Sequence, residues 1–345
     1  MRAPRLHAIV LGLLAAMAAA CGGTDFERST EVTDLRVLAM RLDPPEVEAP
    51  LDESSEPVPV RVTALIASPT GEPTLWQLST CATMHSMGCG SEDPEAEIEV
   101  SAVTSGTAPE LPEGAAPELV VSAEHRFTPE ELFAMVESVG SQGFAGTRPV
   151  FELIAISGEQ SEIAAKRLQV SLPDAAYRML LSQAGIPICD SYGLPEGCLD
   201  YRTRIPNTNP EIEEVRYRRA SREGEESELR LFPADGPLLV SPGETLHIEP
   251  SAAEGSAESH QTLTIQMEDR TVSLEDREEM LIWSWFVTAG EPSRSRTEQR
   301  HTSGELNVWT APEEVPGDGD LWIWIVLRDN RGGVDFTTLH LKVEE

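Results

Sequence analysis

The sequence is poor in basic residues, and this shortage excludes one large class of function. Lysine and arginine number 26 against 59 aspartate and glutamate, which gives a formal net charge of −33. An acidic surface repels phosphate backbones, so we expect no nucleic-acid partner. The same charge is repelled by an anionic membrane surface, so the body of the protein would need a separate anchor to stay there.

Catalytic signatures are absent as well. The chain contains no G-x-S-x-G, no H-E-x-x-H, no P-loop and no G-x-G-x-x-G. The nearest stretch, 139–143, places Ser141 one position from where a nucleophile elbow needs it. The histidines are scattered and form no i,i+4 pair. We therefore expect no catalysis and no cofactor, and we keep a hydrolase with a site built from unrecognised loops as an alternative.

One apolar run stands at the N-terminus, and no other segment is apolar enough to span a membrane. Arg2 and Arg5 precede residues 6–20, which carry no Asp, Glu, Lys or Arg and end in three alanines. The run is too short for a permanent membrane helix but fits a secretory signal. Cys21 follows it directly.

This arrangement resembles the lipobox of bacterial lipoproteins, although Ala18 replaces the usual leucine. The resemblance implies cleavage of a signal peptide, 1–20, and acylation of Cys21. Several acyl chains would give stable membrane anchoring. Gly22 is compatible with an outer-membrane lipoprotein, facing either the periplasm or the surface. The alternative is an ordinary signal peptide cut near Ala20.

Four cysteines remain after Cys21, and an even number in an exported protein favours disulfides. Because each pair closes a short loop, we favour Cys81–Cys89 and Cys189–Cys198; the cross-linked pairings stay open. Cys81, His85 and Cys89 could also bind zinc, but no fourth ligand is evident. We therefore expect a disulfide with a bystander histidine, and no metal.

The sequence pattern predicts an all-β protein with two β-sandwich domains in tandem. A polar tether, 21–34, precedes the first sandwich, 35–173, in which short alternating runs are separated by Pro and Gly turns. A capping box at Thr128 and Glu131 predicts a helical insertion near 128–137, with Leu132, Phe133 and Val136 packing inward. A connector with a disulfide loop, 174–208, and a second sandwich, 209–345, complete the chain.

The last strands carry the strongest local signal. An apolar strand, 321–327, enters the turn Asn330–Gly333, and an alternating strand, 336–343, returns. This ending, with Trp309-Thr310-Ala311-Pro312 before it, resembles the end of bacterial immunoglobulin-like and PKD-like domains. The resemblance implies that the two tandem β-sandwich domains are immunoglobulin-like. The whole chain resembles uncharacterised lipoproteins of predatory and myxobacterial-type proteobacteria, which implies tandem sandwiches and no particular activity.

Tryptophans supply the candidate binding face. Five of the six lie in the second sandwich: Trp283, Trp285, Trp309, Trp322 and Trp324. If Leu321, Ile323, Ile325 and Leu327 face the core, Trp322 and Trp324 face outward beside Phe336, Thr338 and His340 of the final strand. Such an aromatic strip could contact protein or carbohydrate. We favour the alternative that the first sandwich or the acidic segment 267–280 covers it.

Acidic loops near the end of the chain supply a second candidate site. Asp318 and Asp320 could join Asp329 and Asn330 in an oxygen-rich calcium site. No EF-hand spacing occurs, so we expect solvated turns.

The sequence therefore predicts a lipid-anchored envelope protein that acts as a binding or structural module. We expect an envelope protein as its partner, with a carbohydrate-binding module that uses exposed tryptophan as the alternative.

Overall fold

The structure is a computed structural model, and it describes residues 30–50, 55–83, 89, 100–112, 114–142, 148–183, 189, 205–220, 227–266, 271–299 and 306–344. Strands dominate these ranges, so the predicted all-β class is confirmed. Residues 1–29, which include the expected signal peptide and Cys21, lie outside the described part.

The N-terminal half is a sandwich of a three-stranded sheet, ordered β1-β3-β6, and a four-stranded sheet, ordered β5-β4-β7-β8. A short parallel pair, β2 (Glu46–Glu48) and β9 (Gln169–Ser171), lies beside them. The longer strands are β1 (Arg36–Asp43), β3 (Val58–Ala67), β4 (Thr74–Thr83), β5 (Val100–Ala108), β6 (Glu118–Phe127), β7 (Arg148–Ser157) and β8 (Gln160–Arg167).

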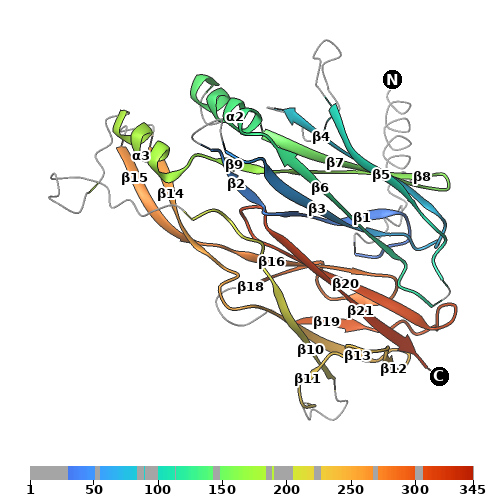
Figure 1. Cartoon of the computed structure of the whole chain (residues 1–345). Helices are drawn as coiled ribbons and strands as arrows, with labels where there is room; N and C mark the ends of the chain where they lie inside the picture. Colours follow the sequence, from blue (N-terminus) through green and yellow to red (C-terminus); the bar gives the residue numbers. More distant parts are fainter. Residues whose placement is uncertain are drawn as a thin grey trace, which may run out of the picture.

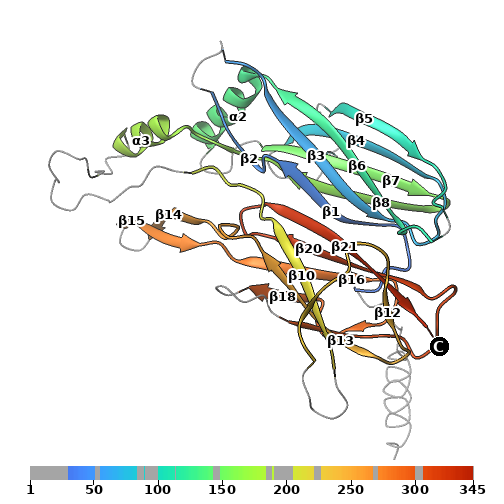
Figure 2. The same ribbon diagram turned by 60° about the horizontal axis from the view of Figure 1, so that its bottom comes forward.

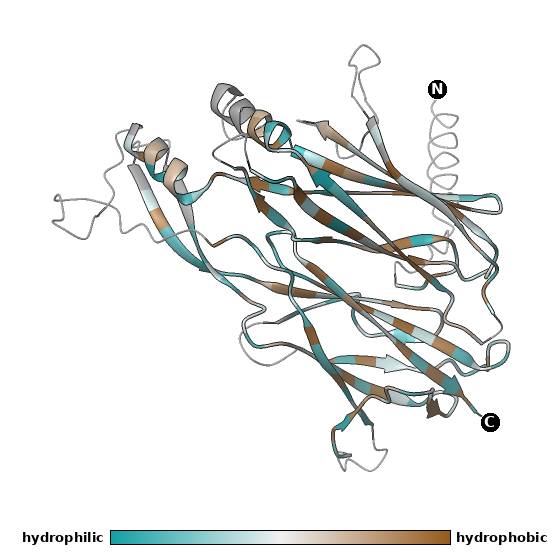
Figure 3. Ribbon diagram, in the orientation of Figure 1, coloured by the Kyte–Doolittle hydropathy of each residue, from teal (hydrophilic) through white to brown (hydrophobic). Residues whose placement is uncertain are grey.

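Alternation along β3 explains the layering. Val60, Val62 and Ile66 enter the core between the two sheets, whereas Leu65 and Ala67 point to the opposite face. Both sets are buried, so this strand is covered on two sides. Figure 3 shows the resulting bands of hydrophobic and hydrophilic residues along the strands.

Helix α2 (Pro129–Gln142) is the predicted insertion, and its predicted capping box is present. The Thr128 hydroxyl accepts the N–H of Glu131 at 3.3 Å, and the Glu131 carboxylate accepts the N–H of Thr128 at 2.7 Å. Leu132 is fully buried, but the prediction for Phe133 was wrong, because its side chain is 44 % exposed. The side chain of Val136 lies outside the described set. Helix α3 (Asp174–Gln183) starts the connector.

The C-terminal half contains two five-stranded sheets, ordered β11-β10-β13-β19-β17 and β12-β21-β20-β16-β18. A separate hairpin, β14-β15, extends from one end (Figure 1). The strands are β10 (Ile212–Arg219), β11 (Arg230–Leu231), β12 (Leu238–Val240), β13 (Thr245–Ala252), β14 (Ser259–Gln266), β15 (Thr271–Glu278), β16 (Leu281–Val287), β17 (Glu291–Pro292), β18 (Arg296–Gln299), β19 (Asn307–Thr310), β20 (Asp320–Arg328) and β21 (Val334–Val343).

The predicted facing of β20 is confirmed. Leu321, Ile323, Ile325 and Leu327 enter the C-terminal core together with Trp283, Trp285 and Trp309. Trp324 and Val326 point to the other side and meet Leu38, Ala39, Leu65 and Ala67 of the N-terminal half. A register shift between Val37 and Ala39 in β1 accompanies the burial of both Leu38 and Ala39 in this cluster.

The four sheets therefore form a four-layer stack, with the two inner sheets packed face to face (Figure 2). Arg41 and Asp335 form an ion pair at 2.7 Å across the inner boundary, and Arg328 donates to the carbonyl of Leu38 at 2.8 Å. The immunoglobulin-like identity of each half, and their independence as tandem domains, stay predictions.

The end of the expected tether is packed rather than free. Val32 is 1 % exposed, and the N–H of Val32 donates to the carbonyl of Val287 at 2.9 Å. The N–H of Val287 donates to the carbonyl of Thr30 at 2.8 Å. The prediction of a flexible segment through residue 34 was wrong for residues 30–32, because burial of Val32 and pairing with Val287 fix these residues against β16.

The inner boundary generates a stability prediction. Trp324 is completely buried, so replacing it with alanine removes a large apolar side chain and leaves a cavity. We expect Trp324→Ala to lower the free energy of unfolding by about 3–5 kcal/mol in urea titrations. The matched variant Trp322→Ala, at a half-buried position on the same strand, should cost less. Equal losses in the two variants would contradict the packing described here.

Candidate functional site

The predicted aromatic binding strip is covered by the N-terminal half. Trp324 is fully buried, and Phe336 packs against the same cluster between the inner sheets. The indole N–H of Trp324 donates to the Glu118 carboxylate at 2.6 Å, and the hydroxyl of Thr338 donates to the same oxygen at 2.7 Å. Trp324 is therefore a packing residue here, and no sugar ring can stack on it.

Trp322 and His340 remain partly exposed at the end of the strip. Their rings stack with centroids 3.9 Å apart and an interplanar angle of 9°. His340 Nε2 lies 2.8 Å from a carboxylate oxygen of Asp320, and Lys342 Nζ lies 3.6 Å from the other oxygen. The histidine ring thus covers one face of Trp322 and is itself held by Asp320.

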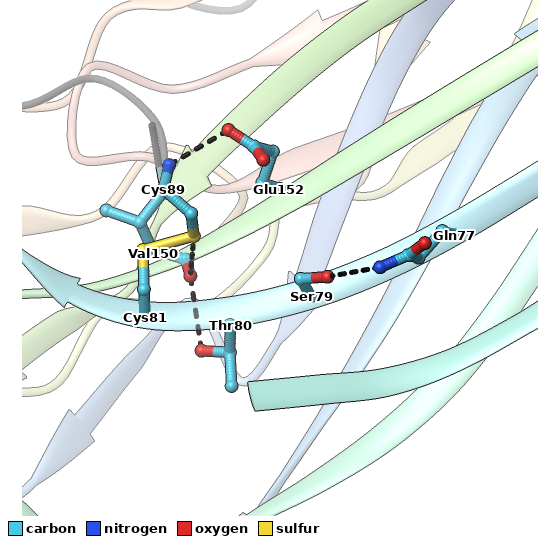
Figure 4. The surroundings of a disulfide bond; sticks show 7 residues. All are labelled: Gln77, Ser79, Thr80, Cys81, Cys89, Val150 and Glu152. Carbon is cyan, nitrogen blue, oxygen red and sulfur yellow. Dashed lines mark hydrogen bonds between the residues drawn. A yellow bond between two sulfur atoms is a disulfide. The ribbon is translucent and has the colours of Figure 1, made fainter. Parts of the chain in front are cut away.

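The disulfide prediction is confirmed for Cys81 and Cys89, which are bonded with their Cα atoms 5.7 Å apart (Figure 4). The Glu152 carboxylate accepts the N–H of Cys89 at 2.9 Å. Both sulfurs are used in the bond, so this pair supplies no thiolate to zinc, and His85 lies outside the described residues. Cys189 is also disulfide-bonded, while Cys198, its expected partner, lies outside the described part.

The two acidic loops do not form one calcium site. Asp320 begins β20 and Asp329 follows its last residue, so the loops lie at opposite ends of a nine-residue strand. The Asp318 carboxylate accepts the N–H of Asp320 at 3.1 Å, which makes a local turn. Within the described ranges, no group of three or more His, Cys, Asp or Glu is arranged to hold a metal ion.

A buried charged cluster, which we call the Arg331 junction, was not predicted from the sequence. The guanidinium of Arg331 lies 3.0 Å from Glu46, 3.1 Å from Glu258 and 3.0 Å from Glu279. The Glu46 and Glu279 side chains are 1 % and 0 % exposed. These residues come from β2, from the loop before β14, from the turn before β16 and from the β20–β21 turn. The junction therefore joins both halves and the base of the hairpin.

Asp329 shapes the turn that holds Arg331 in place. One oxygen of Asp329 accepts the N–H groups of Arg331, Gly332 and Gly333 at 2.8, 2.6 and 2.8 Å. Gly332 has a φ of 109°, which side-chain-bearing residues rarely adopt. A Cβ at Gly333 would contact Asp329 and lie 2.7 Å from Pro210 Cδ. The Asp-x-x-Gly-Gly pattern is thus required by the packing of this turn.

Burial changes the protonation of the junction. It raises the pKa of Glu279 to about 7, although the N–H of Glu258 and the charge of Arg331 oppose the shift. Burial also lowers the pKa of His260, with a further contribution from Arg331. On the neighbouring strand β8, burial lowers the pKa of Lys166 to about 8. In the junction itself, the single guanidinium of Arg331 is shared by three carboxylates, those of Glu46, Glu258 and Glu279.

The outer face of the four-stranded sheet carries exposed apolar side chains. Leu75, Ile156 and Ile163 are 52 %, 41 % and 63 % exposed. Leu75 on β4 lies directly opposite Ile156 on β7. Ile163 on β8 lies directly opposite Ile154, which is two residues before Ile156 on β7 and points to the same face. We call these four residues the β4-β7-β8 apolar face. Exposed apolar groups that cluster in this way are typical of interaction surfaces.

A small apolar crevice lies between the two sheets of the N-terminal half. Ser122 is its one polar side chain, and no titratable side chain lines the crevice to act as a base for the serine hydroxyl. Its lining consists of Val62, Ala64, Trp76, Leu78, Val121, Ser122 and Ala123.

Comparisons with known proteins identify no family. No protein-family model matches the sequence, and no curated protein is similar to it. Red sea bream transglutaminase is similar over 91 % of this chain and 32 % of its own, at 9 % identity and a TM-score of 0.21. Dimeric latent PorU from Porphyromonas gingivalis is similar over 90 % of this chain and 24 % of its own, at 9 % identity and a TM-score of 0.20. This chain thus spans a third or less of either structure, and neither likeness carries an argument.

The Arg331 junction generates a pH prediction. Because the pKa of Glu279 is higher in the folded protein than its ordinary value of 4.5, the folded state keeps its proton to higher pH. Stability from this group is therefore present below about pH 4.5 and is lost as the pH rises to about 7. We expect a loss on the order of 1–3 kcal/mol across that window, the lower value allowing for solvent screening.

Thermal unfolding of wild type and Glu279→Gln between pH 5 and 7.5 measures this contribution. The neutral variant should lose less stability than wild type as the pH rises. His260, whose pKa is lowered, acts in the opposite direction in both proteins, so their difference isolates Glu279. Glu278→Gln, at an exposed neighbour, is the control. Parallel pH profiles for wild type and Glu279→Gln would contradict the assignment.

Proposed function

We propose that this protein is a lipid-anchored component of the cell envelope that acts as a binding or structural interaction module. The observation that carries the proposal is the β4-β7-β8 apolar face, where Leu75, Ile156 and Ile163 are exposed on an outer layer of the stack. Exposing apolar area to water is unfavourable unless another surface covers it. A partner protein in the envelope would provide that cover.

The N-terminal pattern supports the anchor. Cys21 follows a signal-like run, and strand pairing to Val287 begins at residue 30. Nine residues span at most about 30 Å when fully extended, so the body would stay close to the membrane. Among the described residues, no helix has the length and apolar character needed to cross a bilayer. In this proposal the lipid on Cys21 is the attachment.

The attachment point also suggests an orientation. The N–H of Thr288 donates to the carbonyl of Trp322 at 3.0 Å, so residues 30–32 enter the stack beside the start of β20. That end of the stack would face the membrane. The outer sheet of the N-terminal half would then face sideways, toward neighbouring envelope proteins (Figure 2).

The other two functions considered from the sequence have less support. A carbohydrate site would have used Trp324, which is fully buried beneath the N-terminal half. A hydrolase would need convergent catalytic groups, and the crevice described above is lined by apolar residues and one serine. A protein-interaction module needs only an accessible apolar surface on a rigid support.

Site-specific cross-linking in intact envelopes tests the proposal. A photoreactive amino acid is placed at Ile163, and in a matched chain at Leu231, which is equally exposed on the opposite outer sheet. We expect a discrete protein adduct from position 163 and none from position 231. Ile156→Glu in the same chain should lower the yield about tenfold, because a charge in an apolar contact costs roughly 1–3 kcal/mol or more.

Two further results decide the outcome. Cys21→Ser should release the chain from the membrane fraction and remove the adduct. If position 163 gives no adduct in a folded, membrane-bound chain, or if both positions give the same adducts, the proposed role of this face is wrong.

A further inference from the structure

Strand β5 is an edge strand of unusual composition. It is the first strand in the sheet order β5-β4-β7-β8, so only β4 pairs with it among the described strands. Its nine residues, VSAVTSGTA, include no charged residue and no proline. Charged residues make up 25 % of the chain, so a nine-residue strand would be expected to contain about two. The outer edge of β5 therefore lacks the usual protection against strand pairing.

Most other described edges are protected, and the exception is β14 of the separate two-stranded hairpin, whose eight residues also lack Asp, Glu, Lys, Arg and Pro. Strands β11 and β17 have two residues each, β12 has three and β18 has four, which leaves little backbone to pair. At the far edge of the same sheet, β8 carries Glu162, Lys166 and Arg167. The edge strands β1 and β6 of the adjoining sheet also carry charges. Short length, charge and bulges are standard ways to block edge pairing; β5 lacks the first two and carries one register shift, at Val103.

The geometry of β5 suits an added strand. It pairs with β4 from Val100 opposite Cys81 to Ala108 opposite Thr74, and a register shift at Val103 divides this ladder into two parts. In an antiparallel ladder, alternate residues direct their N–H and C=O groups to the free edge. The side chains from Ser101 to Ala108 are small apart from Val103, so none would obstruct a neighbouring backbone.

We propose that the free edge of β5 binds an extended segment of a partner protein, which adds a fifth strand to this sheet. This inference rests on the proposed function and names the class of partner. Backbone hydrogen bonds would supply the affinity, and alternate side chains would supply the selectivity.

Charge indicates what kind of segment fits. Glu72 and Glu110 are exposed near the end of β5 at Ala108. A complementary segment is uncharged in the middle and carries lysine or arginine at the end that lies beside these two carboxylates. A second copy of this chain is disfavoured as the occupant, because each copy has a net charge of −33.

Hydrogen exchange of the full mature chain tests the inference. The probe is a peptide of alternating valine and threonine with two lysines at each end. The control peptide has the same sequence with every valine and threonine backbone nitrogen methylated, which keeps its charge but removes the N–H donors of both edges. We expect the first peptide to slow exchange of β5 amides about tenfold and the control to have no effect.

Proline substitution locates the edge. Adjacent strand residues direct their N–H groups to opposite sides. Of the two substitutions Thr104→Pro and Ser105→Pro, one therefore removes an N–H group that faces β4 and the other removes an N–H group that faces outward. The variant that keeps the wild-type unfolding midpoint identifies the outward residue. In that variant, the protection by the peptide should disappear.

Several results would overturn the inference. The inference is wrong if both peptides slow the exchange of β5 amides equally, if the first peptide slows exchange at another strand edge instead, or if it slows exchange nowhere. Exchange of β5 that slows with protein concentration alone would make a second copy the occupant and would also overturn it. The cross-link at Ile163 reports on the opposite edge of the sheet, so its presence without β5 protection leaves the proposed function intact. If β5 is protected but position 163 gives no cross-link, the proposed role of the β4-β7-β8 apolar face is wrong and the proposal for the β5 edge stands.

Discussion

Burial of the outer face of β20 and β21 against β1 and β3 is the contact on which the rest of the structure depends. Trp324 has no exposed surface, and Glu118 satisfies its indole N–H from the other half. Burying an indole gives a large hydrophobic gain, and the hydrogen bond removes the cost of desolvating its N–H. With this contact made, two sandwiches become one four-layer stack in which only the two outermost sheets present a full face to solvent.

Polar contacts at the boundary between the two halves fix how the inner sheets are placed relative to each other. Arg41, Arg328 and Arg331 each bond a group from the other half. Buried ion pairs are weak evidence for stability, because desolvation offsets much of the attraction. We interpret them as fixing the relative position of the sheets, while the apolar cluster supplies the free energy.

The sequence was sufficient to predict the strands and favoured a covered Trp324 face, but it did not predict which residues meet at the boundary. Alternation predicted the core face of β20, and the Thr128 capping box predicted the start of α2. Glu118, the partner of Trp324, and Glu46, a partner of Arg331, lie more than two hundred residues away in the chain, and no local pattern encodes such pairing. Asp329 looked like a calcium ligand because its role as the acceptor for three backbone N–H groups depends on the folded turn. Residues 30–34 looked like a tether because their polar composition conceals Val32, which pairs with Val287.

The central claim is that the two halves form one rigid stack. It is tested most directly by the distance distribution between spin labels attached at Ile163 and Leu231, which are exposed on the two outermost sheets. Double electron–electron resonance spectroscopy on the purified chain measures that distribution. The account predicts a single narrow peak at the separation given by the structure. A broad distribution, or a second peak at longer distance, would mean that the halves move independently and would contradict it.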